Sequence, residues 1–337
     1  VGSMSIQLYV GADIAAESIQ MDWLNQITQQ RQQMQIQQHK RDYKRLVKQL
    51  TGQVEAGQIQ VVMEATGNYW QAFAEYLHHA GLVVSVLNPT QAKHFAQARL
   101  QRTKTDRVDA QMLREYGRVM EPEAWIPPPL ICQQLQQYLN RRDDLIAMHT
   151  AERNRLHALQ HHPLVLCDLL TPLQVHIREL KTQIEQLEKL IQTLLVSQHA
   201  WAEMVRRLRS IKGLGYLTIA RILTSTHAFA RCSSPDEAVS FAGLAPHVRQ
   251  SGKWKGKSRI GGCGHASLRQ ALYMAALSAA RFNPTLHTFY TQLRQRGKLE
   301  KVALCAVARK LLILAWTLVV KQRDFDPLWA SKSHLPA

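Results

Sequence analysis

An apolar repeat in the middle of the chain restricts the fold more than any other feature. Leucine and isoleucine recur there at alternating intervals of four and three residues. The members are Leu173, Ile177, Leu180, Ile184, Leu187, Ile191 and Leu194. This heptad spacing predicts a long helix with one apolar seam, which we expect to begin with Thr171 as N-cap and Pro172 at its first position. The seam fits a helical hairpin that packs on itself or an intermolecular coiled coil, and either is an arm or spacer rather than a catalytic element.

The sequence pattern differs on the two sides of this arm. Pro127-Pro128-Pro129 marks a linker, and beyond it residues 133–160 predict the first helix of the arm. Before it, helix-like and strand-like stretches alternate, whereas the segment after about residue 201 is mainly helical, with helices near 266–281 and 300–320. We therefore expect a first domain at 4–126, a linker and coiled-coil arm at 127–200, a mainly helical domain at 201–326 and a tail at 327–337.

The first domain predicts a mixed α/β fold. Five short apolar runs are expected to be strands, and two segments have helical spacing. The strands are predicted at 6–12, 18–24, 31–37, 59–63 and 82–87, and the helices at 41–50 and 69–80. This order indicates a mixed sheet whose first three strands form an antiparallel meander.

The net charge indicates a polyanionic partner. Lys and Arg number 42 against 25 Asp and Glu, a difference of +17, and apolar residues make up 46% of the chain. This apolar content excludes wholesale disorder, and the charge favours nucleic acid. A membrane is the competing polyanion, but the most apolar segment, 311–320, has ten residues where a membrane span needs about 20. We expect it to be a buried core helix, with no membrane partner.

Cysteine usage and the first residues favour a reducing cytoplasm. Five cysteines lie far apart without a CxxC pair, which argues against a disulfide framework and against a structural zinc site. Val1-Gly2-Ser3 before Met4 is typical of a cloning remnant, and no signal peptide is expected. The predicted compartment is the cytoplasm.

Four carboxylates in the first domain predict a metal site. Asp13 and Glu64 stand at the ends of predicted strands, and Asp106 and Asp109 lie on one face at the start of a helix. If that helix packs across the sheet where the strands end, all four converge as hard oxygen ligands for Mg²⁺ or Mn²⁺. Two such ions can clamp the oxygens of a phosphoryl displacement. Taken singly, Asp13 also fits a turn cap, Asp106 a helix N-cap and Asp109 a partner of the helix dipole.

A serine in a cationic loop is the candidate nucleophile of the last domain. Ser251 lies beside Gly252, and four cations follow it: Lys253, Lys255, Lys257 and Arg259. A serine hydroxyl needs activation before it can attack, and several cations can hold a phosphate against it. The composition alone favours a flexible phosphate-binding loop over a nucleophile.

The glycine-containing segment 210–215 resembles a helix-hairpin-helix turn. It carries Lys212, Gly213 and Gly215 between two helical stretches. Such glycines let backbone N–H groups approach a DNA phosphate without reading sequence. A plain turn between packed helices explains the same pattern.

Together these motifs resemble one family. The chain is similar to the DEDD transposases of the IS110 group of insertion sequences, relatives of the Piv-type DNA invertases. The resemblance runs from about residue 8 to 320. The matching stretches are Val10-Gly-Ala-Asp13, Met63-Glu-Ala-Thr-Gly67, Val86-Leu-Asn-Pro89, Lys104-Thr-Asp-Arg-Val-Asp-Ala110, Phe241-Ala-Gly-Leu244, Ser251-Gly252 and His265-Ala-Ser-Leu-Arg269.

The resemblance implies a fold and a chemistry. It implies an RNase-H-like (RuvC-like) first domain with Asp13, Glu64, Asp106 and Asp109 as a Mg²⁺-binding tetrad, a coiled-coil arm, and a C-terminal transposase domain with Ser251 as nucleophile. In the family that serine forms a covalent phosphoserine link to DNA. The residues expected to contact nucleic acid are Lys104, Arg107, Lys212, Gly213, Gly215, Arg249, Lys253, Lys255, Lys257, Arg259 and Arg269.

The resemblance also implies partners and a compartment. A non-coding guide (bridge) RNA from the element pairs with donor and target DNA. Because four strands are handled, a dimer or a tetramer built as a dimer of dimers is expected, with an active site shared between protomers. The bacterial cytoplasm is the implied compartment, with association to the nucleoid during activity.

Departures from the family pattern are mild. Ala12 replaces the usual Ile or Val before the first aspartate, and the run Gly261-Gly-Cys-Gly264 is richer in glycine than usual. The tetrad and the serine are intact. Two alternatives stay open: a metal-dependent nuclease of the junction-resolvase kind, with water as nucleophile, and a non-catalytic RNA-binding protein.

Overall fold

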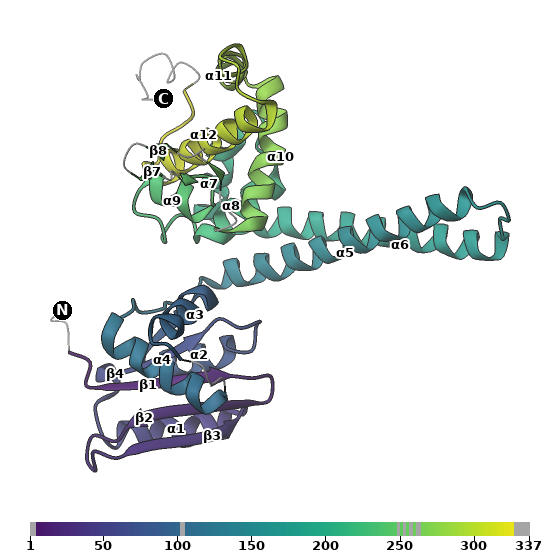
Figure 1. Cartoon of the computed structure of the whole chain (residues 1–337). Helices are drawn as coiled ribbons and strands as arrows, with labels where there is room; N and C mark the ends of the chain where they lie inside the picture. The colour runs from purple at the N-terminus through teal and green to yellow at the C-terminus, as the bar shows by residue number, and fades with distance from the viewer. Residues whose placement is uncertain are drawn as a thin grey trace. The chain divides into compact units, whose positions relative to one another are not determined.

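The computed structural model describes residues 5–101, 105–247, 250–251, 254–255, 259–260 and 264–326 (Figure 1). Between 247 and 259 the description is limited to the backbone of short strands. The chain forms two compact units, Val1–Pro127 and Pro128–Ala337. Their boundary falls within the triple proline, and the arm belongs to the second unit.

The first unit is built on one five-stranded sheet with the order β3-β2-β1-β4-β5. Its strands are β1 (Leu8–Ile14), β2 (Ser18–Leu24), β3 (Arg31–Gln37), β4 (Ile59–Glu64) and β5 (Val83–Leu87). The first three strands pair antiparallel, whereas β4 is parallel to β1 and β5 is parallel to β4. This confirms the predicted mixed sheet with its meander. The first strand extends beyond its predicted end at residue 12, so that Asp13 lies within it.

Helices cover both faces of this sheet. On one face α1 (Lys40–Thr51) and α2 (Gln71–His79) bury Leu46 and Phe73 against the strands, while the short helix η1 (Ala56–Gln58) precedes β4. On the other face α4 (Asp106–Met120) and α3 (Pro89–Ala98) pack over Val62. The helix α3 was not predicted, because Asn88-Pro89 was taken only as a break. Asn88 in fact caps α3, its side chain accepting from the Thr90 N–H at 2.9 Å.

The second unit begins with a long helical hairpin. Helices α5 (Leu130–Gln160) and α6 (Cys167–Leu195) pack side by side and project from the rest of their unit (Figure 1). Leu180 and Ile191 of the predicted seam are buried, and Arg142 of α5 pairs with Glu188 of α6 at 2.6 Å. The chain thus forms the hairpin of the two alternatives, and an intermolecular coiled coil stays a prediction.

The predicted start of α6 was wrong. The helix begins at Cys167, and Pro172 lies inside it. A proline in the second turn removes one intrahelical hydrogen bond, to the carbonyl four residues earlier. The N–H groups of the first helical turn have no intrahelical partners in any case. The helix can therefore begin before the proline, at Cys167.

A helical bundle completes the second unit. It consists of α7 (His199–Arg209), α8 (Tyr216–Thr226), α9 (Pro235–Phe241), α10 (Ala266–Phe282), α11 (Pro284–Gln295) and α12 (Glu300–Val320). The apolar segment predicted at 311–320 belongs to α12, which is 21 residues long and apolar enough to span a membrane by length and composition. The predicted length of ten residues, from which a membrane span was excluded, was therefore wrong. Leu304, Leu311 and Ala315 are nonetheless buried in the bundle, as expected of a core helix.

Candidate active site

Asp13 and Glu64 occupy neighbouring positions at one edge of the sheet. Strands β1 and β4 run parallel, with Ala12 paired to Met63, and each carboxylate residue follows directly. Ala12 and Met63 are buried on the face covered by α1 and α2. Because successive side chains of a strand point to opposite faces, Asp13 and Glu64 belong to the face covered by α4. Both are partly exposed.

Close backbone contact fixes how α4 crosses that face. A Cβ at Gly11 would lie 1.9 Å from the carbonyl oxygen of Ala110, and one at Gly117 would lie 2.7 Å from Cγ2 of Val62 and 3.1 Å from Cδ1 of Tyr9. The glycines let the helix approach the strands to backbone distance. Since Ala110 lies over Gly11 and Gly117 over Tyr9, α4 runs opposite to β1, and its first turn points to the edge that holds Asp13.

The first turn of α4 carries the other two carboxylates. Thr105 is the N-cap, its hydroxyl oxygen accepting from the Val108 N–H at 3.4 Å. The alternative of Asp106 as N-cap is therefore wrong. Asp106 is exposed and Asp109 is partly exposed, and Arg107 between them is an exposed cation.

The four carboxylates share an edge but do not form a closed ligand set. Within the described residues, no three His, Cys, Asp or Glu side chains lie close enough together to hold a metal ion. The Glu64 Oε1 atom instead accepts from the Thr66 hydroxyl at 3.2 Å. The backbone thus brings these four positions to one edge of the sheet, and their role as a metal-binding tetrad stays a prediction.

A buried ion-pair cluster next to this edge was missed by sequence reasoning. Asp22, on β2 opposite Gly11, is fully buried. Its Oδ2 lies 2.6 Å from Nε of Arg31 and 3.0 Å from Nε2 of Gln33, and its Oδ1 lies 3.1 Å from Nη1 of Arg114 on α4. The cluster ties α4 to the strand meander. An aspartate among the apolar residues of the second strand was the signal that could have found it.

The two glycines of the 210–215 turn have different surroundings: Gly213 packs against a helix, whereas Gly215 is open. Gly213 has φ +112°, and a Cβ there would lie 2.6 Å from Cβ of Ala279 on α10. It is thus required for helix packing. Nothing lies within 4 Å of a Cβ at Gly215, where α8 begins, and Lys212 is exposed. Asn283 holds the turn by donating from Nδ2 to the Lys212 carbonyl at 3.4 Å.

The segment that carries Ser251 consists of short paired strands between helices α9 and α10. β6 (Pro246–His247) pairs with β9 (Arg259–Ile260), and β7 (Gln250–Ser251) with β8 (Trp254–Lys255). At its base a Cβ on Gly264 would lie 2.5 Å from the backbone nitrogen of Gly243. Lys104, Arg249, Lys253 and Lys257 lie outside the described residues, and Ser251, Lys255 and Arg259 are described by backbone only.

Two side chains of the predicted His265–Arg269 stretch stabilise this base. Nη1 of Arg269 donates to the Ala242 carbonyl at 3.2 Å, and this bond fixes the backbone at the base of the segment. The His265 side chain caps α10 by accepting from the Leu268 N–H at 3.3 Å, and the backbone N–H of His265 donates to the Phe241 carbonyl at 2.8 Å. Burial, and then the charges of Arg221, Arg231 and Arg269, lower the pKa of His265 below its ordinary value. His265 is therefore a neutral imidazole at neutral pH.

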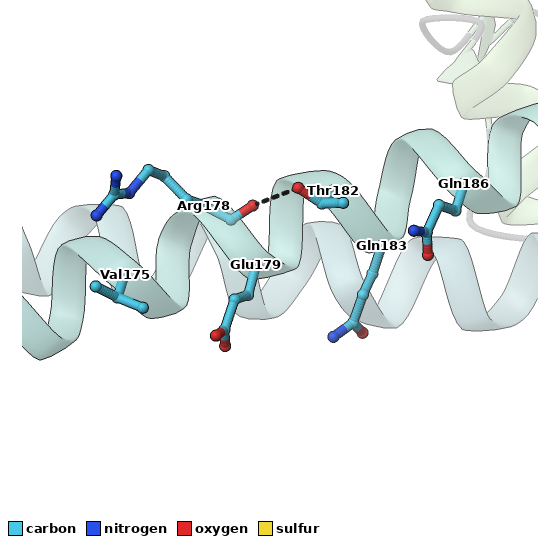
Figure 2. A pocket seen from close by; sticks show the side chains of 6 residues that line it. All are labelled: Val175, Arg178, Glu179, Thr182, Gln183 and Gln186. Atoms are coloured by element: carbon cyan, nitrogen blue, oxygen red, sulfur yellow. Dashed lines mark hydrogen bonds between the residues drawn. The ribbon is translucent and has the colours of Figure 1, made fainter.

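A shallow hollow on α6 contains none of the predicted site residues. Figure 2 shows its lining, and the Thr182 hydroxyl there donates to the Arg178 carbonyl at 3.1 Å. The lining residues are Val175, Arg178, Glu179, Thr182, Gln183 and Gln186. They lie off the apolar seam and come from one helix, so the hollow is a feature of the arm surface.

Two regions of the chain match transposase families. Residues 10–162, which include all four carboxylates, match the DEDD transposase family of the IS110 type, described as Transposase. Residues 205–291, which include Ser251, match a family described as Transposase IS116/IS110/IS902. The candidate residues of both units therefore lie inside matched regions.

Curated relatives include DNA-inverting and insertion-element proteins. The chain is 31% identical over 274 residues to the pilin gene-inverting protein of Moraxella bovis, covering 80% of this chain and 82% of that protein. The protein of the same name from Moraxella lacunata gives the same identity and coverage. An uncharacterized 42 kDa protein of insertion element IS900 from Mycobacterium paratuberculosis is 26% identical over 186 residues, 55% of this chain and 46% of that protein.

The sheet edge and these similarities define an enzyme of DNA transposition and recombination. The chain belongs to the IS110 family of transposases and is homologous to the pilin gene-inverting proteins. The DEDD class of transposase implies dependence on a divalent metal ion.

Proposed function

We propose that this chain is the RNA-guided recombinase of an insertion sequence, which cuts and rejoins DNA through a phosphoserine intermediate. The observation that carries the proposal is the sheet edge, where neighbouring parallel strands and the first turn of α4 present Asp13, Glu64, Asp106 and Asp109. The strand order, with a meander on one side of β1 and parallel strands on the other, supports an RNase-H-like (RuvC-like) domain.

The four carboxylates are the proposed ligands of Mg²⁺, or of Mn²⁺ in its place. Their fit rests on the donor set, since carboxylate oxygens on one partly exposed edge suit hard divalent cations. A bound ion would polarise the scissile phosphate and offset the charge that develops on it. The protein's part is to hold the ligands on rigid strands and on a capped helix.

Ser251 is the proposed nucleophile. Its Oγ gives up a proton and bonds to phosphorus, while the bond from phosphorus to a deoxyribose oxygen breaks and that oxygen takes up a proton. The cations of the same segment, Lys253, Lys255 and Arg259 among them, are proposed to hold the phosphate and offset its charge. The phosphoserine link keeps the bond energy for rejoining.

The nucleic-acid partners are proposed from charge and from family. The net charge of +17 suits simultaneous contact with a guide RNA and two DNA segments. Exposed Arg107 and Lys212, with the open Gly215, are the described candidates for backbone contact. The pilin gene-inverting relatives support a DNA-rearranging role by their name. We place this activity in the bacterial cytoplasm, at the nucleoid, in a dimer or in a dimer of dimers joined through the arm.

An adduct assay tests the serine. The full chain is incubated with Mg²⁺, donor and target DNA, and transcripts of the non-coding sequence beside its gene, then denatured in SDS. We expect a protein–DNA adduct that is absent without transcript and absent from Ser251→Ala, whereas Ser240→Ala, a change at a serine of α9, retains it. Cleaved product from Ser251→Ala without any adduct would instead show a metal-dependent nuclease with water as nucleophile. Binding of RNA with no cleavage by any variant would show a non-catalytic RNA-binding protein.

A further inference from the structure

One exposed aromatic side chain lies at the same sheet edge as the carboxylates. Tyr69 is 53% exposed, and in the described part of the first unit it is the only Phe, Trp or Tyr that is exposed. It belongs to the loop between Glu64, the last residue of β4, and α2. The exposed ring presents an apolar face to solvent close to the carboxylates, where it can contact a strand that reaches them.

The loop holds this ring in a defined place. Gly67 has φ +56°, and a Cβ there would lie 3.5 Å from Cδ2 and Cε2 of Tyr69. The ring thus packs on the glycine backbone by one part of its surface. Trp70 Nε1 donates to the Gly67 carbonyl at 3.1 Å and so anchors the loop. The Trp70 ring in turn packs edge-on against Trp125.

Gln38 connects the loops that follow both catalytic strands. Its Nε2 donates to the Ala15 carbonyl at 2.7 Å and to the Tyr69 carbonyl at 3.2 Å. The Tyr43 hydroxyl donates to Oε1 of the same side chain at 2.7 Å. Ala15 follows Asp13 by two residues, and Tyr69 follows Glu64 by five. The backbone of Tyr69 is therefore braced against the segment that carries the first carboxylate.

Positive charge follows directly after this brace. Lys40 and Arg41 open α1, next to Gln38 in the chain, and both are exposed. Proteins hold single-stranded nucleic acid by combining aromatic rings, on which bases stack, with cations, which contact the phosphates. An edge that presents carboxylates for strand cleavage needs such a holder for the strand next to the scissile phosphate.

We propose that Tyr69 stacks on an unpaired base of the DNA strand that enters the carboxylate edge, and that Lys40 and Arg41 contact its phosphates. This inference rests on the proposed function, since the strand is the one that the carboxylates act on. DNA is the assigned ligand because the family acts on DNA. Gln38 fixes the backbone of Tyr69 and Gly67 contacts part of its ring, so less entropy is lost when a base stacks on the ring than for a free side chain.

A fluorescent base tests the stacking without any cleavage. The full chain carrying Asp13→Asn is titrated with single-stranded DNA in which 2-aminopurine replaces each base in turn. We expect quenching confined to one or two positions, kept in Tyr69→Phe and lost in Tyr69→Leu. The affinity of Tyr69→Leu should fall about 5- to 150-fold, the usual loss for one stacked base. Phe282→Leu is the control, because Phe282 is an exposed ring of the second unit, 68% exposed.

The salt dependence of binding tests the cations. Replacing Lys40 and Arg41 together by Gln should lower the slope of log affinity against log salt by about 1.4, the value for two contacts to single-stranded phosphates. An unchanged slope would remove both cations from the proposal.

Other outcomes separate this inference from the function on which it rests. Unchanged quenching and affinity in Tyr69→Leu would overturn the stacking site, even if Glu64→Gln still abolished cleavage by the otherwise native chain. Tyr69-dependent quenching of an RNA series and not of the DNA series would make the ligand RNA and overturn the DNA assignment. Stacking that persists while Glu64→Gln leaves cleavage intact would overturn the proposed function alone.

Discussion

In the first unit the candidate catalytic carboxylates lie on strands and on a capped helix, whereas in the second unit Ser251 lies on a strand of two residues. The carboxylate edge is held by backbone contact at Gly11 and by the buried Asp22 cluster. The serine segment is held at its base by the close backbone approach at Gly264 and by the backbone hydrogen bond of His265. The comparison teaches that substitutions at the packing contacts of the first unit should appear as lost folding, while changes at the carboxylates or within the serine segment should appear as lost chemistry.

The largest effect is expected at the contact between Gly11 and α4. Gly11→Val would place Cβ 1.9 Å from the carbonyl oxygen of Ala110, a backbone atom that moves only with the helix. We expect the free energy of unfolding of the first unit to fall by more than about 4 kcal/mol, measured by denaturant titration. The matched control is Gly215→Ala, where nothing lies within 4 Å and the change should stay within about 1 kcal/mol. Equal stability of both variants would contradict the close packing of α4.

Removal of the buried carboxylate should rank next. Asp22→Ala leaves the charges of Arg31 and Arg114 without their buried partner, which typically costs about 3–5 kcal/mol. Arg45→Ala breaks an exposed pair with Asp42 at 3.5 Å and should change stability by about 0.5 kcal/mol or less. Thermal and denaturant unfolding of the two variants provide the comparison. A loss in Asp22→Ala no greater than that in Arg45→Ala would show that the cluster does not hold α4.

A smaller effect is expected from the acid titration of the second unit. Burial, and then the nearby charge of Arg231, lower the pKa of His227 to about 4. Protonation therefore favours the unfolded chain, whose histidine has a pKa near 6.5. The stability contributed by neutral His227 is complete above about pH 6.5 and is lost as the pH falls towards 4. We expect a loss of about 1–2 kcal/mol from this residue, allowing for its partial exposure.

His227→Asn is the control for that titration. Asparagine tolerates the left-handed backbone at this position, where φ is 50°, and it does not titrate. The difference in unfolding free energy between native and variant chains should shrink by this amount from pH 7 to pH 4. A difference that stays constant over this range would contradict the assigned pKa.

The elements of the first unit were predictable because strand and helix signals are local. Alternating and apolar runs located all five strands, and the carboxylates near strand ends followed from them. The approach of α4 to Gly11 joins residues about a hundred positions apart, and no local pattern encodes it. For the same reason Asp22 was missed, since its partner Arg114 lies far along the chain.

In the second unit the errors have local causes. The helix start predicted at Pro172 was wrong because packing in the hairpin stabilises a longer helix than the cap pattern predicts. The ten-residue apolar segment was only the most apolar half of α12, whose first half mixes Lys301 with buried Leu304. The proposed roles of Ser251 and its neighbouring cations stay predictions.

The central proposal is that the carboxylate edge and Ser251 act on one phosphodiester. Peptide mass spectrometry of the denatured protein–DNA adduct, with matched samples of Glu64→Gln and Glu55→Gln, tests it most directly. The account predicts a nucleotide attached to Ser251 in the native chain and in Glu55→Gln, and no adduct in Glu64→Gln. A nucleotide on another residue, or an undiminished Ser251 adduct in Glu64→Gln, would contradict it.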